Sequence, residues 1–355
     1  MGAIEANASQ PDAPAGLSDY THGTPRQTAG YREDNMIRRR TLIKGASMVA
    51  MAAAMSGVSV RSSDAQVPNS TGTEPAKLKA PANACDCHMH IYDPRFPESN
   101  PRPGLNPKNA TVQDYRLIQK RIGTTRVVVV TPRNYATDNR VTVDALAQLG
   151  ANARGVAVVH PTVTDAELKS LNDAGVRGIR FSLGDPKTAV VSFDMVEPLA
   201  KRVADLGWHV QFNLDGDQIA AHADLLTRLP SQLVFDHMGH PTLPAGVDHE
   251  SFGIMRRLID KGRTWVKLSG AYSNSTVGPP SYPEATKIAQ AFVQGAPEHI
   301  VWGSDWPHPG EQNKPPLPND ALLFDLLATW SPDEATRNRI LVTNPEALYG
   351  FAKTT

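Results

Sequence analysis

From residue 82 onward, short apolar runs rich in β-branched residues alternate with longer stretches whose apolar residues recur at helical spacing. Strands that alternate with helices in this way are typical of parallel β/α units. We predict eight strands, at residues 84–91, 126–131, 155–160, 176–182, 209–214, 233–237, 265–269 and 300–305. Helices are predicted at 111–122, 139–150, 164–173, 193–206, 216–229, 249–262, 283–295 and 318–329, with one more at 332–346.

This count predicts an α/β fold, a single (β/α)8 TIM barrel over residues 82–355 preceded by a linker at 66–81. Eight β/α units in about 270 residues match the usual size of such a barrel, whereas an open doubly wound sheet would normally carry a Gly-rich phosphate loop that this sequence lacks. Two helix starts carry their own signal: Thr164 and Glu167 resemble a capping box, and Ser331 before Pro332 predicts a capped start with proline in the first turn.

Charge and composition narrow the class of protein. The 36 basic and 36 acidic side chains balance, which favours a small-molecule enzyme over a nucleic-acid-binding protein, because the latter usually has a basic surplus. Outside one N-terminal stretch no apolar run is long enough for a membrane span, so we expect no membrane partner for the mature chain. Cys85 and Cys87 are predicted to be unbridged core residues, with a zinc-ligand role as the alternative.

The N-terminal region is predicted to be an export signal and not part of the fold. Residues 1–35 are polar and aperiodic, which predicts a disordered extension and makes Met36 a candidate start besides Met1. Residues 36–65 contain a basic cluster, a weakly apolar run and a small-x-Ala cleavage site. The string Arg39-Arg40-Thr41-Leu42-Ile43-Lys44 resembles the twin-arginine signal, which predicts a periplasmic or secreted protein. The alternative is an Ala-rich helix after a basic cluster.

Candidate catalytic residues stand at the carboxyl ends of the predicted strands, where the loops of a TIM barrel converge. His88 and His90 end the first strand two residues apart, so their imidazoles point the same way. His237 ends the sixth strand and Asp305 the eighth. Each residue alone could simply anchor a loop, but their convergence on one barrel mouth predicts a reaction centre.

Further segments around these residues resemble the amidohydrolase-related (amidohydrolase 2) family. Within it they are most similar to the lactonase branch that includes 4-sulfomuconolactone hydrolase, galactarolactone isomerase and 2-pyrone-4,6-dicarboxylate hydrolase. The resemblance spans residues 82–352. The segments that carry it are Cys85–Asp93, Val176–Phe181, Gly207–Val210, Asp236–Pro241, Trp265–Gly270 and Val301–Pro309.

The resemblance implies a mechanism in which Asp305 takes a proton from water and later returns it. His88, His90 and His237 would hold the lactone carbonyl oxygen, directly or through a metal. Related barrels often use two metals bridged by a lysine after the fourth strand, but that strand ends Arg180-Phe181-Ser182 here. His88, His90 and Asp305, with His237 in reach, could still hold one Zn²⁺. Because the branch includes metal-free and zinc-containing enzymes, the sequence leaves the metal open.

An anionic lactone requires fixed cations, and arginine suits a carboxylate or sulfonate because its planar fork donates two parallel hydrogen bonds. Arg180 and Arg133 are the leading candidates. Weaker candidates at matching loop positions are Tyr135, Lys187, Asn213, His240 and Tyr272. The pyrone-dicarboxylate enzymes carry arginines at the place of His240 and near that of Tyr272, so the resemblance favours a sugar-acid lactone or a sulfomuconolactone over a dicarboxylate.

The sequence therefore predicts a lactonase, a carboxylic ester hydrolase acting on a small anionic lactone. An intramolecular lactone isomerase would use the same residues and stays open, as does 2-pyrone-4,6-dicarboxylate hydrolysis. A decarboxylase is a further enzyme alternative, although the strand-1 pattern of such enzymes is not clear here. The non-enzyme alternative is a periplasmic small-molecule binding protein on a degenerate barrel. The sequence also leaves open whether the chain forms a homo-oligomer.

Overall fold

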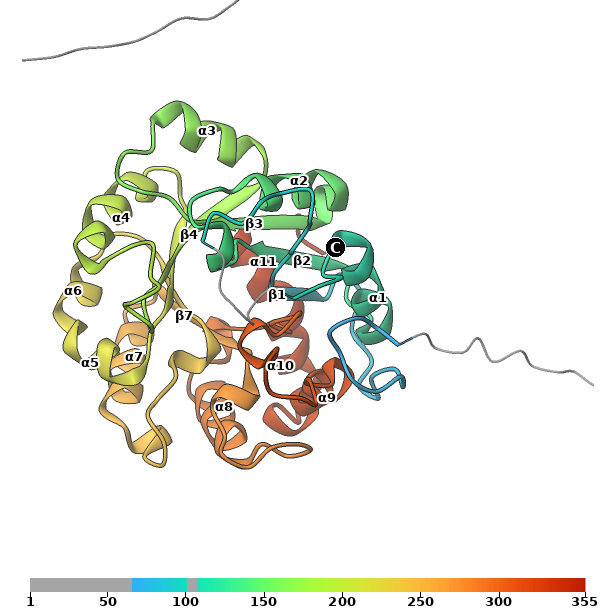
Figure 1. Ribbon diagram of the computed structural model, residues 1–355. Coiled ribbons are helices and arrows are strands. Elements are labelled where there is room, and N and C mark those ends of the chain that lie inside the picture. Colours follow the sequence, from blue (N-terminus) through green and yellow to red (C-terminus); the bar gives the residue numbers. More distant parts are fainter. Residues whose placement is uncertain (1–65, 101–106, 355) are drawn as a thin grey trace, which may run out of the picture. The chain divides into compact units, whose positions relative to one another are not determined.

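The computed structural model describes residues 66–100 and 107–354. Its strands form one sheet in the order β1 to β8, and each pair of neighbours from β1/β2 to β7/β8 is parallel (Figure 1). The predicted TIM barrel is thereby confirmed. The strands are β1 Cys85–Met89, β2 Arg126–Val130, β3 Ala153–Ala157, β4 Val176–Ser182, β5 His209–Asn213, β6 Leu233–Phe235, β7 Thr264–Leu268 and β8 Ile300–Trp302.

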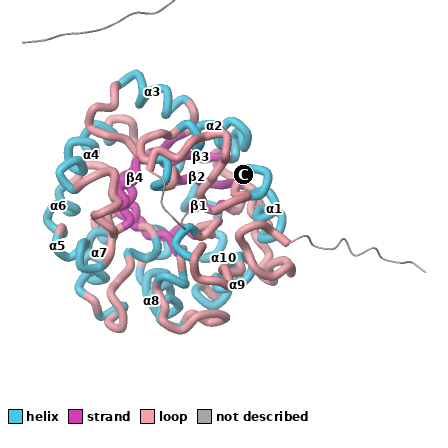
Figure 2. Tube along the Cα trace, viewed as in Figure 1, coloured by secondary structure: helices cyan, strands magenta, loops and turns pink. Residues whose placement is uncertain are grey.

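Helices follow the strands and surround them, as the magenta strands inside the cyan helices of Figure 2 show. They are α1 Val112–Ile122, α2 Arg140–Leu149, α3 Asp165–Asp173, α4 Val196–Ala204, α5 Gly216–Ala221, α6 Ala223–Arg228, α7 Glu250–Asp260, α8 Pro283–Gly295, α9 Asp320–Trp330, α10 Glu334–Asn338 and α11 Asn344–Tyr349. Each main helix buries one apolar face against the strands; in α8, for example, Ile288 and Phe292 are fully buried.

The first and last strands meet through hydrogen bonds just beyond β8. The Asp305 amide donates to the His88 carbonyl (2.7 Å), and the His90 amide donates to the Trp306 carbonyl (2.8 Å). Gly303 permits this close approach, because a Cβ there would lie 2.5 Å from the Cβ of His88. The seam that closes the barrel therefore brings the end of β1 and the residues after β8 together.

Part of the barrel interior is an apolar cluster. There Tyr349 and Phe351, from the C-terminal region, pack against the strand side chains. The backbone register of β1 shifts between Asp86 and Met89, which lets both Cys87 and the adjacent His88 face the interior. The strand side chains of this cluster are Cys85, Cys87, Val128, Val130, Val156, Val234, Trp265 and Val301. Both cysteines are buried and unbridged, as predicted.

Several element boundaries differ from the prediction. The sixth and eighth strands end before His237 and Asp305, because both residues have left-handed backbones (φ 48° and 60°) that a strand does not accommodate. The third strand, at Ala153–Ala157, begins two residues and ends three residues earlier than predicted, and the helix predicted at 216–229 breaks at His222. The capping box of Thr164 is confirmed.

The C-terminal helical region also departs from the prediction. Asp333 and not Ser331 caps the helix that begins at Glu334, with the Asp333 side chain accepting a hydrogen bond from the Thr336 amide. The region predicted as one helix at 332–346 consists of α10, a π-helical stretch at Arg339–Thr343 and α11. A proline at the second position of α11, Pro345, lacks the amide hydrogen needed to continue regular α-helical bonding from the preceding turn.

The segment at residues 66–81, predicted as a linker, is part of the folded unit. Its Pro68 carbonyl accepts a hydrogen bond from the Trp306 indole (2.9 Å), and the Thr71 hydroxyl donates to the Leu317 carbonyl (2.8 Å). The predicted extension 1–35 and signal 36–65 lie outside the described residues. Within the described part of the chain, no helix is long and apolar enough to cross a membrane.

Candidate active site

A cavity of about 180 Å³ lies at the carboxyl ends of the strands. Its walls contain His90, His237 and Asp305 together with five of the predicted substrate-binding residues. Those five are Arg133, Arg180, Asn213, His240 and Tyr272. A larger hollow of about 730 Å³, lined by residues of α2, α3 and the adjoining loops, contains none of the predicted site residues. The carboxyl-end cavity is therefore the candidate active site.

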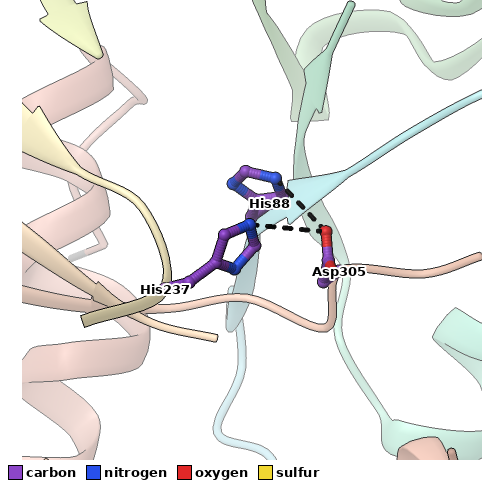
Figure 3. Close-up of side chains that lie close together, drawn as sticks. All are labelled: His88, His237 and Asp305. Carbon is purple, nitrogen blue, oxygen red and sulfur yellow. Dashed lines mark ion pairs between the residues drawn. The ribbon is translucent and has the colours of Figure 1, made fainter. Parts of the chain in front are cut away.

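Three imidazoles surround one carboxylate oxygen in this site. Oδ1 of Asp305 lies 3.4 Å from Nε2 of His88, 3.4 Å from Nε2 of His90 and 3.9 Å from Nε2 of His237. Figure 3 shows the imidazoles of His88 and His237 both facing the Asp305 carboxylate. The structure thus brings together all four residues that the sequence nominated as catalytic, although they come from β1, the loop after β6 and the loop after β8.

The hydrogen-bond partners of the outer ring nitrogens indicate where the imidazole hydrogens lie. Nδ1 of His90 is 2.8 Å from the Val130 carbonyl and must donate to it, because a carbonyl only accepts. Nδ1 of His88 lies 3.1 Å from the carboxylate of Asp236, which also favours a hydrogen on that atom. In their neutral forms both rings then present lone pairs at Nε2, and these two atoms are only 3.2 Å apart.

Two imidazole lone pairs and a carboxylate oxygen therefore converge without a hydrogen to share. Buried acceptors in this arrangement require a proton or a metal cation between them. Ligand atoms of His88, His237 and Asp305 all lie within 4.8 Å of one another, and this set differs from the predicted His88, His90 and Asp305 by exchanging His90 for His237. The residues present fit one Zn²⁺, whose usual ligands are imidazole nitrogen and carboxylate oxygen.

The electrostatic environment favours neutral imidazoles beside an ionised carboxylate. Burial lowers the pKa of His88, His237 and His240, the last to about 3. Burial alone would raise the pKa of Asp305, but the surrounding imidazoles of His237, His90 and His88 outweigh it and hold that pKa well below its usual range. At neutral pH the site therefore contains an ionised carboxylate.

A second ionic group lies directly beneath the imidazoles. Oδ2 of Asp236 accepts hydrogen bonds from Arg180 Nε (2.9 Å) and Gln211 Nε2 (3.1 Å). Nζ of Lys267 donates to Gln211 Oε1 (2.7 Å) and lies 3.3 Å from His88 Nδ1. Asp236, Gln211 and Lys267 have no exposed surface. Because Arg180 is tied to Asp236 through Nε, its guanidinium is fixed in the wall of the cavity.

The backbone around the cavity adopts conformations that non-glycine residues rarely take. Left-handed φ values occur at His237 (48°), Met238 (58°), His240 (41°), Asp305 (60°) and His308 (58°). Such residues cost on the order of 1–3 kcal/mol each and cluster at functional sites. Here they turn the chain sharply after β6 and β8, which directs the side chains of His237 and Asp305 toward each other.

The structure does not bring two predicted binding residues into the cavity. Tyr135 is 2% exposed, and its hydroxyl contacts the backbone of Asp93 at 3.1 Å (amide) and 3.4 Å (carbonyl), so its role is to anchor the loop after β1. Lys187 is exposed and absent from the cavity wall. Both lie in loops whose path the strand pattern does not determine.

Comparisons with known proteins identify the family of the chain. The amidohydrolase family profile matches residues 85–351. The chain is 35% identical to 2-pyrone-4,6-dicarboxylate hydrolase from Comamonas testosteroni (77% of this chain, 92% of the relative). It is 33% identical to 4-sulfomuconolactone hydrolase from Rhizobium radiobacter (78% and 93%) and 33% identical to D-galactarolactone isomerase from Agrobacterium fabrum (76% and 91%). A crystal structure from Agrobacterium tumefaciens superposes with a TM-score of 0.72 at 30% identity (81% and 99%). The chain therefore belongs to the amidohydrolase family.

Proposed function

We propose that the protein is a lactonase, which opens the ring ester of a small anionic lactone with water. The observation that carries this proposal is the ionised Asp305 carboxylate, enclosed by three imidazoles in a cavity whose wall also holds Arg133 and Arg180. Ester hydrolysis needs a base for water, a group that stabilises the developing oxyanion and a proton for the leaving oxygen. The relatives named as lactone hydrolases support the same chemistry.

Each step follows from an atom of this site. Oδ1 of Asp305 takes a proton from water, which then attacks the lactone carbonyl. The Ser269 hydroxyl lies 2.9 Å from His237 Nδ1 and can donate to it, which places the ring hydrogen on Nε2 for donation to the developing oxyanion. Asp305 then returns its proton to the leaving ring oxygen, so that the acid and alcohol ends of the product form together.

A Zn²⁺ bound by His88, His237 and Asp305 would polarise the lactone carbonyl as a Lewis acid. The Ser269 hydroxyl can accept as well as donate, so it is also compatible with a His237 that offers Nε2 to a metal. Metal analysis of the purified protein tests this role. About one zinc per chain, with turnover lost on chelation and restored by added zinc, would support this role; full turnover by metal-depleted protein would contradict it.

The substrate that this cavity favours is a single ring with one or two anionic groups. About 180 Å³ suits one small ring, and the arginines supply the planar donors that carboxylate and sulfonate groups bind. Sugar-acid lactones and sulfonated muconolactones both meet this description. A lactone isomerase is the second candidate, because a substrate hydroxyl in place of water would use the same residues, and the chain is 33% identical to a lactone isomerase.

A panel of sugar-acid lactones, muconolactones, 4-sulfomuconolactone and 2-pyrone-4,6-dicarboxylate tests the proposal with purified protein. We expect saturable hydrolysis of at least one anionic lactone and weaker turnover of neutral lactones of the same ring size. Reaction in ¹⁸O-labelled water separates the two candidates, because hydrolysis incorporates the label and isomerisation need not. Turnover of no member of the panel would contradict lactonase function.

We also propose that the chain is exported through the twin-arginine route, on the strength of the Arg39-Arg40 string and the apolar run that follows it. N-terminal sequencing of protein from a periplasmic fraction is the test. A mature chain that begins near Gln66 is expected, and Arg39→Lys with Arg40→Lys should abolish export. Full-length protein confined to the cytoplasm would contradict the proposal.

A further inference from the structure

The two oxygens of the Asp305 carboxylate have different partners. Oδ1 faces the imidazoles of His88, His90 and His237. Oδ2 points the other way and accepts a 2.5 Å hydrogen bond from the Tyr272 hydroxyl. A carboxylate oxygen only accepts, so the Tyr272 hydroxyl is the donor in this contact. Only one oxygen of the carboxylate is therefore directed at the reaction centre.

The Tyr272 hydroxyl is itself held by a buried histidine and carboxylate. Its oxygen lies 3.1 Å from Nδ1 of His308, and Nε2 of His308 lies 3.1 Å from Oδ2 of Asp320. His308 and Asp320 have no exposed surface. A carboxylate only accepts, so Nε2 of His308 donates to Asp320, while Nδ1 of His308 faces the Tyr272 oxygen. The chain then runs as Asp320 to His308 to Tyr272 to Asp305.

Backbone contacts anchor the outer end of this chain. The His308 amide donates to the Asp305 carbonyl (2.7 Å), which fixes the loop that carries both residues. Asp320 is the first residue of α9, and its amide lies 3.2 Å from the Ser70 hydroxyl in the N-terminal segment. Because each member is tied to the next and the last is tied to a helix, the Tyr272 hydroxyl has little freedom to move.

We propose that Tyr272, His308 and Asp320 are positioning residues. They hold Oδ2 of Asp305 in a hydrogen bond, so that Oδ1 alone faces water and the imidazoles. The inference rests on the proposed role of Asp305 as the base. It changes the interpretation of Tyr272, which the sequence suggested as a substrate contact. A carboxylate without this restraint rotates about its Cβ–Cγ bond, and misplacement of a reacting group by about 1 Å lowers turnover by as much as about 100-fold.

Kinetics of three variants test the chain. Tyr272→Phe removes the hydroxyl and keeps the ring; we expect kcat to fall about ten-fold or more while KM stays within about two-fold. Asp320→Asn should lower kcat by a smaller factor. Because Asp320 acts through Tyr272, the double variant should be no slower than Tyr272→Phe alone, a coupling that independent loop damage does not produce. The control is Tyr349→Phe, another buried tyrosine, which should leave kcat unchanged.

Two kinetic results would overturn the proposal. A Tyr272→Phe variant with unchanged kcat and a raised KM would make the hydroxyl a substrate contact. If the losses in kcat of the two single variants multiply in the double variant, Asp320 acts independently of Tyr272 and is a purely structural residue. A third measurement does not depend on lactone turnover: crystal structures of the parent and Tyr272→Phe proteins should show Asp305 rotated or in two orientations only in the variant. An unchanged Asp305 would refute positioning even if no lactone is turned over.

Discussion

The two ends of the barrel interior are built on the same strands but have opposite chemistry. The apolar end, which packs against Tyr349 and Phe351, contains the fully buried cluster of Val128, Val156, Val234 and Val301. The ionic end, next to the cavity, holds equally buried ionic or polar groups, Asp236, Lys267 and Gln211, none of which has exposed surface. The apolar end contributes stability through burial of hydrocarbon, whereas the ionic end must offset the desolvation of its charges.

This contrast indicates that the ionic end lowers the stability of the protein. Buried ion pairs rarely stabilise a fold more than apolar residues of the same size would. Left-handed backbones at His237 and Asp305 add strain at the same end of the barrel. Both features direct side chains to the cavity, so we interpret them as costs accepted for function. The contrast predicts that substitutions at the ionic end affect turnover. Substitutions at the apolar end should affect stability alone.

The largest expected effect is that of Asp305→Asn on turnover. Asparagine keeps the size of the side chain and tolerates the left-handed backbone (φ 60°), but it cannot take a proton from water. We expect kcat/KM to fall by about 10²- to 10⁴-fold, while urea denaturation gives a free energy of unfolding within about 1 kcal/mol of the parent. Turnover within ten-fold of the parent would exclude Asp305 as the base.

The next largest effect is that of Asp236→Asn on stability. Asp236 is the shared counter-charge of Arg180 (2.9 Å) and Lys267 (3.6 Å), and removal of one partner of a buried pair costs about 3–5 kcal/mol because the other charge stays buried. Chemical denaturation measures the loss. Turnover should fall as well, because His88 loses the carboxylate that orients its ring.

The double variant Asp236→Asn with Lys267→Met is the matched control for this prediction. It removes one positive and one negative charge together, so it should recover a substantial part of the lost stability but none of the lost turnover. If Asp236→Asn alone is as stable as the parent, the ionic group does not carry the desolvation cost that we infer for it. If the double variant recovers turnover, the group has no role in orienting His88.

The fold was predictable from the sequence because it depends on a repeated local pattern. Each β/α unit shows the change from strand to helical period, and eight repeats favour one closed barrel. Strand ends were less predictable: β6 and β8 stop at Phe235 and Trp302, earlier than their apolar patterns suggested. The left-handed turns that end them follow from contacts with the loops, and local propensity does not encode such contacts.

The convergence of the four candidate catalytic residues was predictable, but the groups that contact them were not. His88, His90, His237 and Asp305 stand at strand ends, which barrel geometry brings together. Lys267 lies in the middle of β7 and has no exposed surface; a lone lysine inside an apolar strand was the available signal for a buried ionic group. His308 and Asp320 gave no such signal, because their approach depends on how the loop after β8 folds.

A smaller effect is expected at the apolar end, from Val234→Ala. Val234 is fully buried in the apolar cluster. Loss of its two methyl groups removes buried hydrocarbon and leaves a cavity, so the free energy of unfolding should fall by about 1–3 kcal/mol. Thermal and urea denaturation measure this. The value of kcat/KM should stay within about two-fold of the parent, and a ten-fold loss would show that the two ends of the barrel are coupled.

The smallest effect, and the one of opposite sign, is expected for Tyr349→Phe. Tyr349 is fully buried at the apolar end, and its hydroxyl has no hydrogen-bond partner among the described protein atoms. An unsatisfied buried hydroxyl is destabilising, so its removal should leave the free energy of unfolding unchanged or raise it by up to about 1 kcal/mol. Tyr272→Phe, the same chemical change at the ionic end, should instead lower kcat, because its hydroxyl donates to Asp305. If Tyr349→Phe instead destabilises the protein by more than about 2 kcal/mol, the hydroxyl has a partner of its own. The apolar end would then contain a polar network, and the contrast between the two ends would be one of degree.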